Sequence, residues 1–122
     1  MSRRESPIHT KSYDLLKWLL PSTAKFPREQ RFALARQIED AAFGFHRAIV
    51  ESSQGQRAAL READLHLTLL RTYLRLACDL RYYSLNQYEH AARLVDELER
   101  LVGGWKRVAA APSTAPSALR GP

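Results

Sequence analysis

Arginine is the residue type whose number and spacing suggest chemistry in this chain. Fifteen of its 19 basic residues are Arg, and the formal net charge is +6. Arg57, Arg61, Arg71 and Arg75 are spaced so that they share one polar strip of a helix. The planar guanidinium group binds phosphate or carboxylate in two places at once. The strip therefore predicts a surface for a polyanion such as nucleic acid, or for an acidic protein.

Further basic and aromatic residues extend this candidate surface. A second row of arginines repeats every seven residues, and two neighbouring tyrosines could stack on bases or sugars if they are exposed. The full set of candidate nucleic-acid or partner-binding residues is Arg57, Arg61, Arg71, Arg75, Arg81, Tyr82, Tyr83, Arg93, Arg100, Lys106 and Arg107. A solvated face, in which Asp64 and Asp79 neutralise the arginines, is the alternative that stays open.

The other reactive residue types form no catalytic or metal-binding pattern. His46, His66 and His90 fall on three different predicted helices, and neither Glu-x-x-His nor His-Glu-x-x-His occurs. We expect them to be partly exposed. The five glycines form no phosphate-binding loop, and Cys78 has no evident activating base. Cys78 is instead predicted to be a small buried residue, so we expect no catalysis, no metal and no cofactor.

The segment 60–80 must position the first arginine strip. Its apolar residues recur at spacings of three and four, which predicts the buried seam of a helix; they are Leu60, Ala63, Leu67, Leu70, Leu74 and Ala77. Four more residues, Leu69, Tyr73, Leu76 and Leu80, widen the apolar surface beyond half of the circumference. The helix is therefore either central to its domain or packed on a second molecule.

Three other helices are predicted around it. The first starts at Lys11 and kinks or stops at Pro21; the second covers 27–53, with Phe32 on its apolar face. Gly44 lies inside the second helix and predicts a close helix crossing. The fourth helix opens at Ser84-x-x-Gln87, a capping box, and continues to about residue 108.

These elements predict an all-α antiparallel four-helix bundle over residues 11–108. A flexible leader is expected at 1–10, and a disordered Ala/Pro/Ser tail at 109–122. No apolar run reaches the roughly 18 residues of a membrane span, and no signal peptide is evident, so we expect a cytoplasmic protein with no membrane contact.

Four segments together resemble a known family in their order and spacing. They are 26–32 (FPREQRF), 70–76 (LRTYLRL), 82–91 (YYSLNQYEHA) and 103–105 (GGW). They are similar to the Avd-like family, the accessory variability determinant proteins of diversity-generating retroelements. Four-helix proteins encoded within ribosomal RNA intervening sequences are related to it. The resemblance covers roughly residues 13–108.

The resemblance implies a homopentameric barrel of four-helix bundles with a basic surface. It implies that the chain binds the reverse transcriptase of the same retroelement, its template RNA and the cDNA, and supports mutagenic retrohoming without being the polymerase. Arg71 and Arg75 correspond to basic positions of the family's third helix. The family's basic C-terminal extension is matched only by Lys106, Arg107 and Arg120. The alternative is a protein-interaction oligomer of the intervening-sequence type, with no direct nucleic-acid role.

Overall fold

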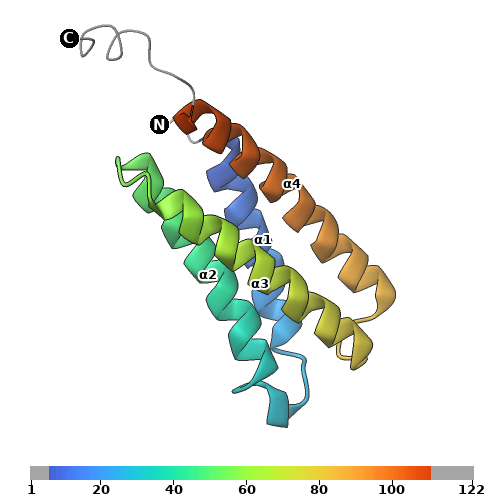
Figure 1. The fold of residues 1–122 in the computed structure, drawn as a ribbon. Helices are drawn as coiled ribbons and strands as arrows, with labels where there is room; N and C mark the ends of the chain where they lie inside the picture. Colours follow the sequence, from blue (N-terminus) through green and yellow to red (C-terminus); the bar gives the residue numbers. More distant parts are fainter. Residues whose placement is uncertain (1–5, 111–122) are drawn as a thin grey trace, which may run out of the picture.

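Four long helices and one short 3-10 helix make up the part of the chain that the computed structural model describes, residues 6–110 (Figure 1). Successive helices run in opposite directions and pack on their chain neighbours, and α4 closes the bundle against α1. Helices α1 and α3 therefore occupy diagonal corners, as do α2 and α4. The elements are α1 (Pro7–Thr23), η1 (Arg28–Gln30), α2 (Leu34–Ser53), α3 (Ala59–Asp79) and α4 (Leu85–Ala110).

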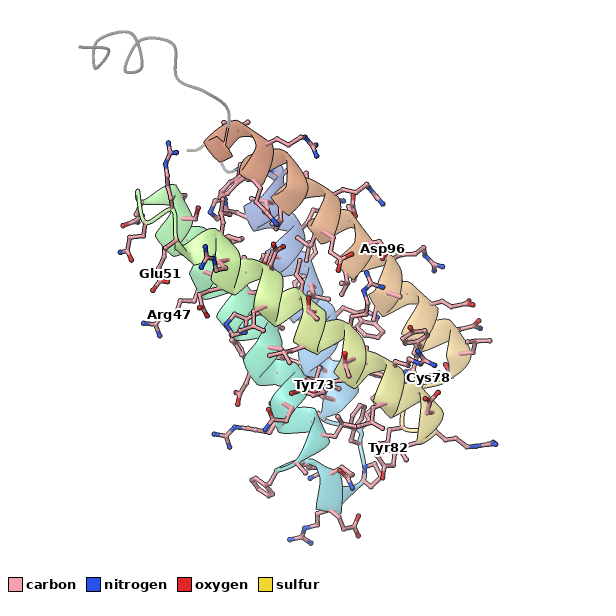
Figure 2. The ribbon with its side chains drawn as sticks, viewed as in Figure 1. Arg47, Glu51, Tyr73, Cys78, Tyr82 and Asp96 are labelled. Atoms are coloured by element: carbon pink, nitrogen blue, oxygen red, sulfur yellow. The ribbon has the colours of Figure 1, made fainter. Side chains whose placement is uncertain are left out.

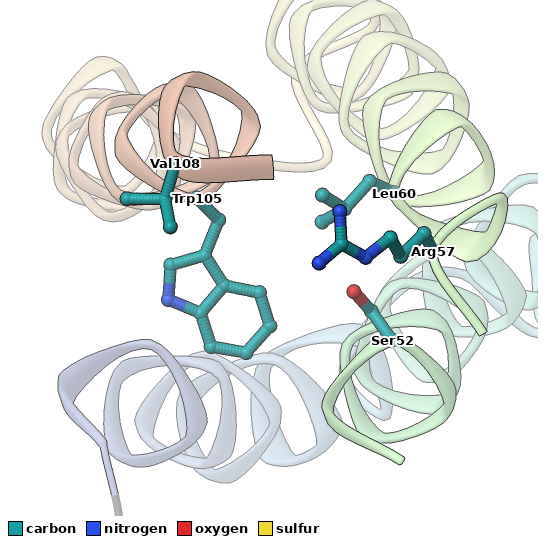
Figure 3. Close-up of a pocket in the computed structure, with 5 residues that line it drawn as sticks. All are labelled: Ser52, Arg57, Leu60, Trp105 and Val108. Atoms are coloured by element: carbon teal, nitrogen blue, oxygen red, sulfur yellow. The ribbon is translucent and has the colours of Figure 1, made fainter. Parts of the chain in front are cut away.

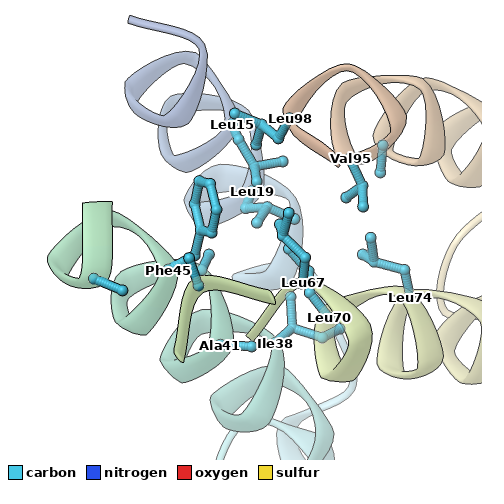
Figure 4. Packing of buried hydrophobic residues seen from close by; sticks show 14 of the residues in the cluster. Leu15, Leu19, Ile38, Ala41, Phe45, Leu67, Leu70, Leu74, Val95 and Leu98 are labelled. Carbon is cyan, nitrogen blue, oxygen red and sulfur yellow. The ribbon is translucent and has the colours of Figure 1, made fainter. Parts of the chain in front are cut away.

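The predicted seam of α3 is confirmed. All six of its residues are buried, with exposed fractions of 7% or less. All of them except Leu60 belong to one core with apolar side chains of the other three helices, and Figure 4 shows Leu67, Leu70 and Leu74 in it. Leu15 and Leu19 enter this core from α1, Phe45 from α2, and Val95 and Leu98 from α4. One continuous core therefore holds all four helices together, so the expectation of a four-helix bundle is also confirmed.

The additional apolar surface of α3 stays largely uncovered within this chain. Leu65, Leu76 and Leu80 are 49%, 43% and 47% exposed. A helix at the corner of a four-helix bundle buries only the stripe that faces its two neighbours and the core. Of the two alternatives for α3, the central helix of the domain is therefore wrong, and packing on a second molecule stays a prediction.

The first helix begins earlier than the sequence predicted. α1 starts at Pro7 rather than Lys11, because Pro fits the first helical position and Ile8 is buried in the core at 1% exposure. α1 also continues through Pro21 to Thr23 instead of stopping at the proline. The Thr23 hydroxyl of this last turn donates its proton to Glu39 Oε2 of α2 at 2.6 Å, and it lies 3.1 Å from the carbonyl oxygen of Leu19.

The second helix begins later than predicted. Residues after Pro27 form η1 and a turn, and α2 starts only at Leu34. Ala33 precedes α2 with φ −120° and ψ −99°, which breaks the helical register, and its side chain offers no cap. Phe32 therefore leaves the predicted apolar face and is 84% exposed.

Two local predictions are confirmed in detail. The capping box forms: the Ser84 N–H donates to Gln87 Oε1 at 2.8 Å, and the Gln87 N–H donates to Ser84 Oγ at 3.1 Å. Gly44 marks a close approach between α2 and α3, because a Cβ at this position would lie 2.6 Å from Nε2 of His66. α4 includes residues 109 and 110 of the predicted disordered tail, and the rest of that tail, 111–122, lies outside the described residues. Among the described helices, none is long and apolar enough to cross a membrane.

Candidate nucleic-acid interface

Arg71 joins α3 to α4 by ion pairs. Its Nη2 group donates to Asp96 Oδ1 at 2.5 Å and to Glu99 Oε1 at 2.8 Å. The hydrogen bond to Asp96 is the main cause that raises the pKa of the Arg71 guanidinium above its ordinary value. Figure 2 shows Asp96 on α4. A phosphate that bound Arg71 would have to compete with two carboxylates, so this residue is a poorer anion site than the sequence suggested.

The rest of the α3 strip is more accessible. Arg61 and Arg75 are exposed, and Arg75 makes only a loose contact with Asp79, 3.9 Å from Nε to Oδ2. Asp79 is thus the partner that the solvated-face alternative predicted. Asp64, the other predicted partner, pairs instead with Lys106 of α4. Lys106 is therefore held between the two helices, like Arg71.

Arg57 lies at the end of the bundle, where the four helices stand at the corners of a square (Figure 3). It lines a small cavity of about 220 Å³ together with Ser52, Leu60, Trp105 and Val108. Trp105 is half-buried and its ring lies 5.8 Å from that of His9. The structure thus places Arg57 beside the indole of Trp105 at the end of the bundle. Along the helix, Arg57 is about one turn from Arg61 and about five turns from Arg75.

The second arginine row lies on the outer surface of α4. Arg93, Arg100 and Arg107 are all exposed and, within residues 6–108, none of them forms an ion pair. The core positions of this helix are Ala91, Val95, Leu98 and Val102. Arg93 and Arg100 each follow a core residue by two positions, so they project away from the bundle.

Three of the four acids of α4 pair with residues of other helices. Asp96 and Glu99 bind Arg71 of α3, and Glu97 binds Lys11 of α1 at 3.2 Å. Glu89 is the remaining acid of this helix, and it is exposed. Three of the four carboxylates thus pair with neighbouring helices, and none of the four forms an ion pair with the arginine row within residues 6–108.

The prediction of two exposed tyrosines is wrong for Tyr83. Its side chain is 2% exposed, it packs edge-on against Phe26 at 4.9 Å between ring centroids, and its hydroxyl is hydrogen-bonded to Ser22 at 2.7 Å. Burial raises the pKa of Tyr83 to about 12. Tyr82 is half-buried, with its ring 5.5 Å from that of Phe26 (Figure 2). The two rings fill the α3–α4 end of the core, and only Tyr82 keeps an accessible face.

Arg81 precedes these tyrosines in an unusual conformation. Its φ is +67°, in the left-handed region that glycine usually occupies. The Arg81 N–H donates to the Cys78 carbonyl and the Tyr82 N–H to the Ala77 carbonyl, the two bonds of a Schellman motif that ends α3. Arg81 therefore places a long, exposed cationic side chain at a position where any side chain strains the backbone.

The histidines and the cysteine are packing residues. His46 is hydrogen-bonded to Ser12 at 2.9 Å, His66 lies over Gly44, and His90 lies 5.0 Å from the Trp18 ring. All three are partly or fully exposed, as predicted. Cys78 is half-buried rather than buried. Within the described residues, no three of His, Cys, Asp and Glu gather in a way that could hold a metal ion.

These observations define an all-helical bundle with a cationic outer surface on α4. The model of the bAvd-like family matches residues 7–109. The match spans most of the 122 residues and all four helices, so the chain belongs to the bAvd-like family. The resemblance seen in the sequence is thereby confirmed. A search of curated proteins gave no match.

Proposed function

We propose that this chain is a non-catalytic accessory subunit of a diversity-generating retroelement. It binds the reverse transcriptase and its template RNA and cDNA through the basic surface of α4 and α3, and so supports mutagenic reverse transcription and retrohoming. It acts in the cytoplasm as a homo-oligomer, a pentamer by analogy with the family. Membership of the bAvd-like family supports the role.

The observation that carries the nucleic-acid part of the proposal is the arginine row of α4. Its residues are exposed, have no carboxylate partner within residues 6–108, and lie on one helix face. Seven residues of helix rise by about 10.5 Å. Successive phosphates of one strand rise by about 3.4 Å, so the row matches roughly every third phosphate. Arg61, Arg75 and Arg81 add exposed cations on α3 and at its end.

The test replaces the three arginines of the row with Gln, which removes the charge and keeps a strong helix former. Counterion release predicts that log Kobs for single-stranded RNA falls with log[salt] at a slope about two units shallower in the variant, from three lost contacts at roughly 0.7 each. Fluorescence anisotropy of a labelled RNA, titrated at several salt concentrations, gives both slopes. Pull-down of the cognate reverse transcriptase by the two proteins tests the second partner.

The matched control is Arg36→Gln with Arg47→Gln on α2. These arginines are also exposed, but each pairs with an acid one turn away, Arg36 with Asp40 at 3.6 Å and Arg47 with Glu51 at 3.1 Å. The control variant should keep the slope of the unmodified protein. Equal slopes for all three proteins, together with an unchanged pull-down, would show that the row is only a solvated face.

The second candidate function is a protein-interaction oligomer of the ribosomal RNA intervening-sequence type. The uncovered leucines of α3 favour it, because contiguous apolar surface on a soluble domain usually marks a protein contact. In that case the positive charge is incidental. A reverse transcriptase gene next to the coding gene, with paired template and variable repeats, supports the first function. A coding gene inside a ribosomal RNA gene supports the second.

A further inference from the structure

A small cavity opens between α1 and the start of α4, two helices that lie side by side where the bundle closes (Figure 1). Its volume is about 280 Å³. The residues that line this α1–α4 cavity are Lys17, Trp18, Pro21, Ser22, Lys25 and Gln87. The lining thus combines one large aromatic ring, two cations and no acid.

One wall of the α1–α4 cavity is aromatic. Trp18 is half-buried, and its ring lies 5.6 Å from that of Tyr83 and 5.0 Å from that of His90. Tyr83 is buried and supports the indole from the core, whereas His90 is exposed on α4. The indole is therefore held in place, and its accessible part and the imidazole of His90 offer a surface on which a nucleobase can stack.

The two lysines supply positive charge at the same cavity. Lys17 lies within α1 and Lys25 just after its end, and both are exposed. Within residues 6–108 neither forms an ion pair. Lys17 Nζ lies 5.6 Å from the centre of the Tyr13 ring, a contact that leaves its charge unneutralised. Both ammonium groups are thus available to an anion in the cavity.

Acidic residues near the cavity lie outside its lining. Asp14 is the only acid of α1, and Glu89 is the first acid of α4. Glu39 of α2 accepts a hydrogen bond from Thr23. Exposed Arg93 adds a further cation along α4. The positive charge is therefore concentrated at the cavity itself.

The cavity also presents neutral hydrogen-bonding groups. Pro21 has no backbone N–H, so the Lys17 carbonyl lacks its usual helical donor four residues on. The Gln87 Oε1 atom accepts from the Ser84 N–H at 2.8 Å, which leaves the two N–H groups of the side-chain amide for another acceptor. An acceptor and an amide donor beside an aromatic ring suit the edge of a nucleobase, and the ammonium groups suit its phosphates.

The α1–α4 cavity continues the arginine row of α4. Gln87, His90 and Arg93 follow one another at spacings of three, so they form a line on the helix surface. From Gln87 to Arg93 the helix rises by about 9 Å, which corresponds to between two and three nucleotides of one strand. A strand that lies along the row therefore extends to the cavity.

From these observations we infer that the α1–α4 cavity binds one nucleotide of a single strand, with the base against Trp18 and His90 and the flanking phosphates on Lys17 and Lys25. The inference rests on the nucleic-acid binding of the proposed function and deepens it, because it adds a base contact to the phosphate contacts of the row. Stacking accepts every base, so the cavity favours unpaired strands without selecting their sequence.

Trp18 itself reports this contact, because a stacked base quenches indole fluorescence. The chain has two tryptophans, so Trp105→Phe leaves Trp18 as the single reporter, and Trp105→Tyr replaces that variant if it does not fold. The probes are a hexanucleotide RNA of mixed sequence, an abasic ribose-phosphate strand of six units, and hexaglutamate. Half-maximal quenching should require at least fivefold less RNA than abasic strand or hexaglutamate.

Equal responses to the RNA and to the abasic strand would mean that the lysines bind phosphate without a base contact. A stronger response to hexaglutamate would mean that the cavity takes an acidic peptide. Either result would overturn the inference, as would a Trp18 signal that none of the probes changes.

Gln87→Glu tests the cavity without disturbing the helix start, because Glu also completes a capping box. It replaces the amide donor by a negative charge, so the RNA concentration for half-maximal quenching should rise by about tenfold. Gln37→Glu, which adds the same charge at an exposed position of α2, is the matched control and should change it less than twofold. Asp14→Asn should lower it. Thermal melting checks that each variant folds, and equal effects of the two Glu variants would contradict a contact at Gln87.

These outcomes are separable from those of the proposed function. The cavity variants keep all three arginines of the row, and the row variant keeps the cavity. A shallower salt slope in the row variant together with an unquenched Trp18 would refute the cavity inference alone. An unchanged slope together with quenching that depends on Gln87 would refute the role of the row alone.

Discussion

Arg81 ends α3 in a backbone conformation that glycine adopts at lower energy. A side chain in the left-handed region costs roughly 1 kcal/mol, and functional sites are where such strain is kept. Arg81→Gly is therefore expected to raise the free energy of unfolding by about 1 kcal/mol and at the same time to weaken RNA or reverse-transcriptase binding. Urea denaturation and RNA anisotropy measure the two effects.

The control for this change is Arg81→Asn, since Asn tolerates the left-handed region better than most residues but lacks the charge. It should weaken binding like Arg81→Gly with a smaller gain in stability. A stabilised Arg81→Gly protein with unchanged binding to both partners would mean that the residue has no part in the interface.

The raised pKa of Tyr83 predicts that the protein loses stability at alkaline pH. Its pKa is raised by burial from 10.0 to about 12, so the folded state keeps the phenol proton between these values while the unfolded state loses it. The stability that this group contributes is complete below pH 10 and is lost as the pH rises toward 12. At about 1.4 kcal/mol per pKa unit, the loss approaches roughly 3 kcal/mol.

Tyr83→Phe removes the titrating group together with its hydrogen bond to Ser22. The variant should be about 1 kcal/mol less stable at pH 8, and its free energy of unfolding should fall less steeply above pH 10 than that of the unmodified protein. Denaturant midpoints at pH 8 to 11.5 measure this, and the difference between the two proteins cancels the titration of the lysines. Parallel curves above pH 10 would contradict the assignment.

At the scale of helices, the contact between α2 and α3 depends on Gly44. A Cβ there would lie 2.6 Å from Nε2 and 2.7 Å from Nδ1 of His66, whose Nδ1 is buried without a hydrogen-bond partner. Gly44→Ala should lower the free energy of unfolding by about 1–3 kcal/mol through overpacking, although Ala is the better helix former by about 1 kcal/mol. Chemical denaturation of the two proteins gives the difference.

Gly103→Ala is the matched control on α4. The nearest atom to its Cβ would be Nη1 of Arg107, the end of a flexible side chain at 3.5 Å, so the same substitution should be neutral or stabilising there. The double change Gly44→Ala with His66→Ala should recover part of the loss. If Gly44→Ala also proves stabilising, the close crossing does not constrain this position.

Local patterns predicted the helices to different degrees. The start of α3 was located to within one residue and the capping box of α4 was correct, because the apolar periodicity and the reciprocal cap each depend on residues within a single helix. The end of α3 was predicted at Tyr82 or Tyr83, but α3 stops at Asp79 and Arg81 takes a left-handed conformation. The start of α2 was misplaced, since Phe32 has the right spacing for the apolar face while the break at Ala33 depends on how the chain turns from η1.

The same limit applies to the candidate site. The seven-residue spacing placed Arg93, Arg100 and Arg107 correctly on one exposed face of α4. The pairing of Arg71 with Asp96 and Glu99 depends on the register between α3 and α4, which no local pattern encodes. The burial of Tyr83 likewise results from the position of Phe26 and Ser22 in the fold.

At the scale of the whole assembly, a ring would repeat the arginine row once in every copy. From Arg93 to Arg107 the row spans about 21 Å, which matches about six nucleotides of one strand. A longer RNA would contact several copies at once, and each further contact would then form at a high effective concentration. Affinity for long RNA should therefore depend on assembly, and affinity for a short oligonucleotide should not.

Variants with altered exposed apolar residues, such as Tyr13→Glu with Phe43→Glu or Leu65→Glu with Leu76→Glu, separate the two contributions once light scattering gives the monomer mass of 13.9 kDa, because they carry the row but cannot repeat it. We expect them to bind a six-nucleotide RNA as tightly as the unmodified protein, and an RNA of about 40 nucleotides at least tenfold more weakly and with a shallower salt slope. Anisotropy titrations with both RNAs measure this. Equal affinity of monomer and oligomer for the long RNA would mean that only one copy of the oligomer binds the RNA. The arginine rows of the other copies would then either contact the reverse transcriptase or have no binding role.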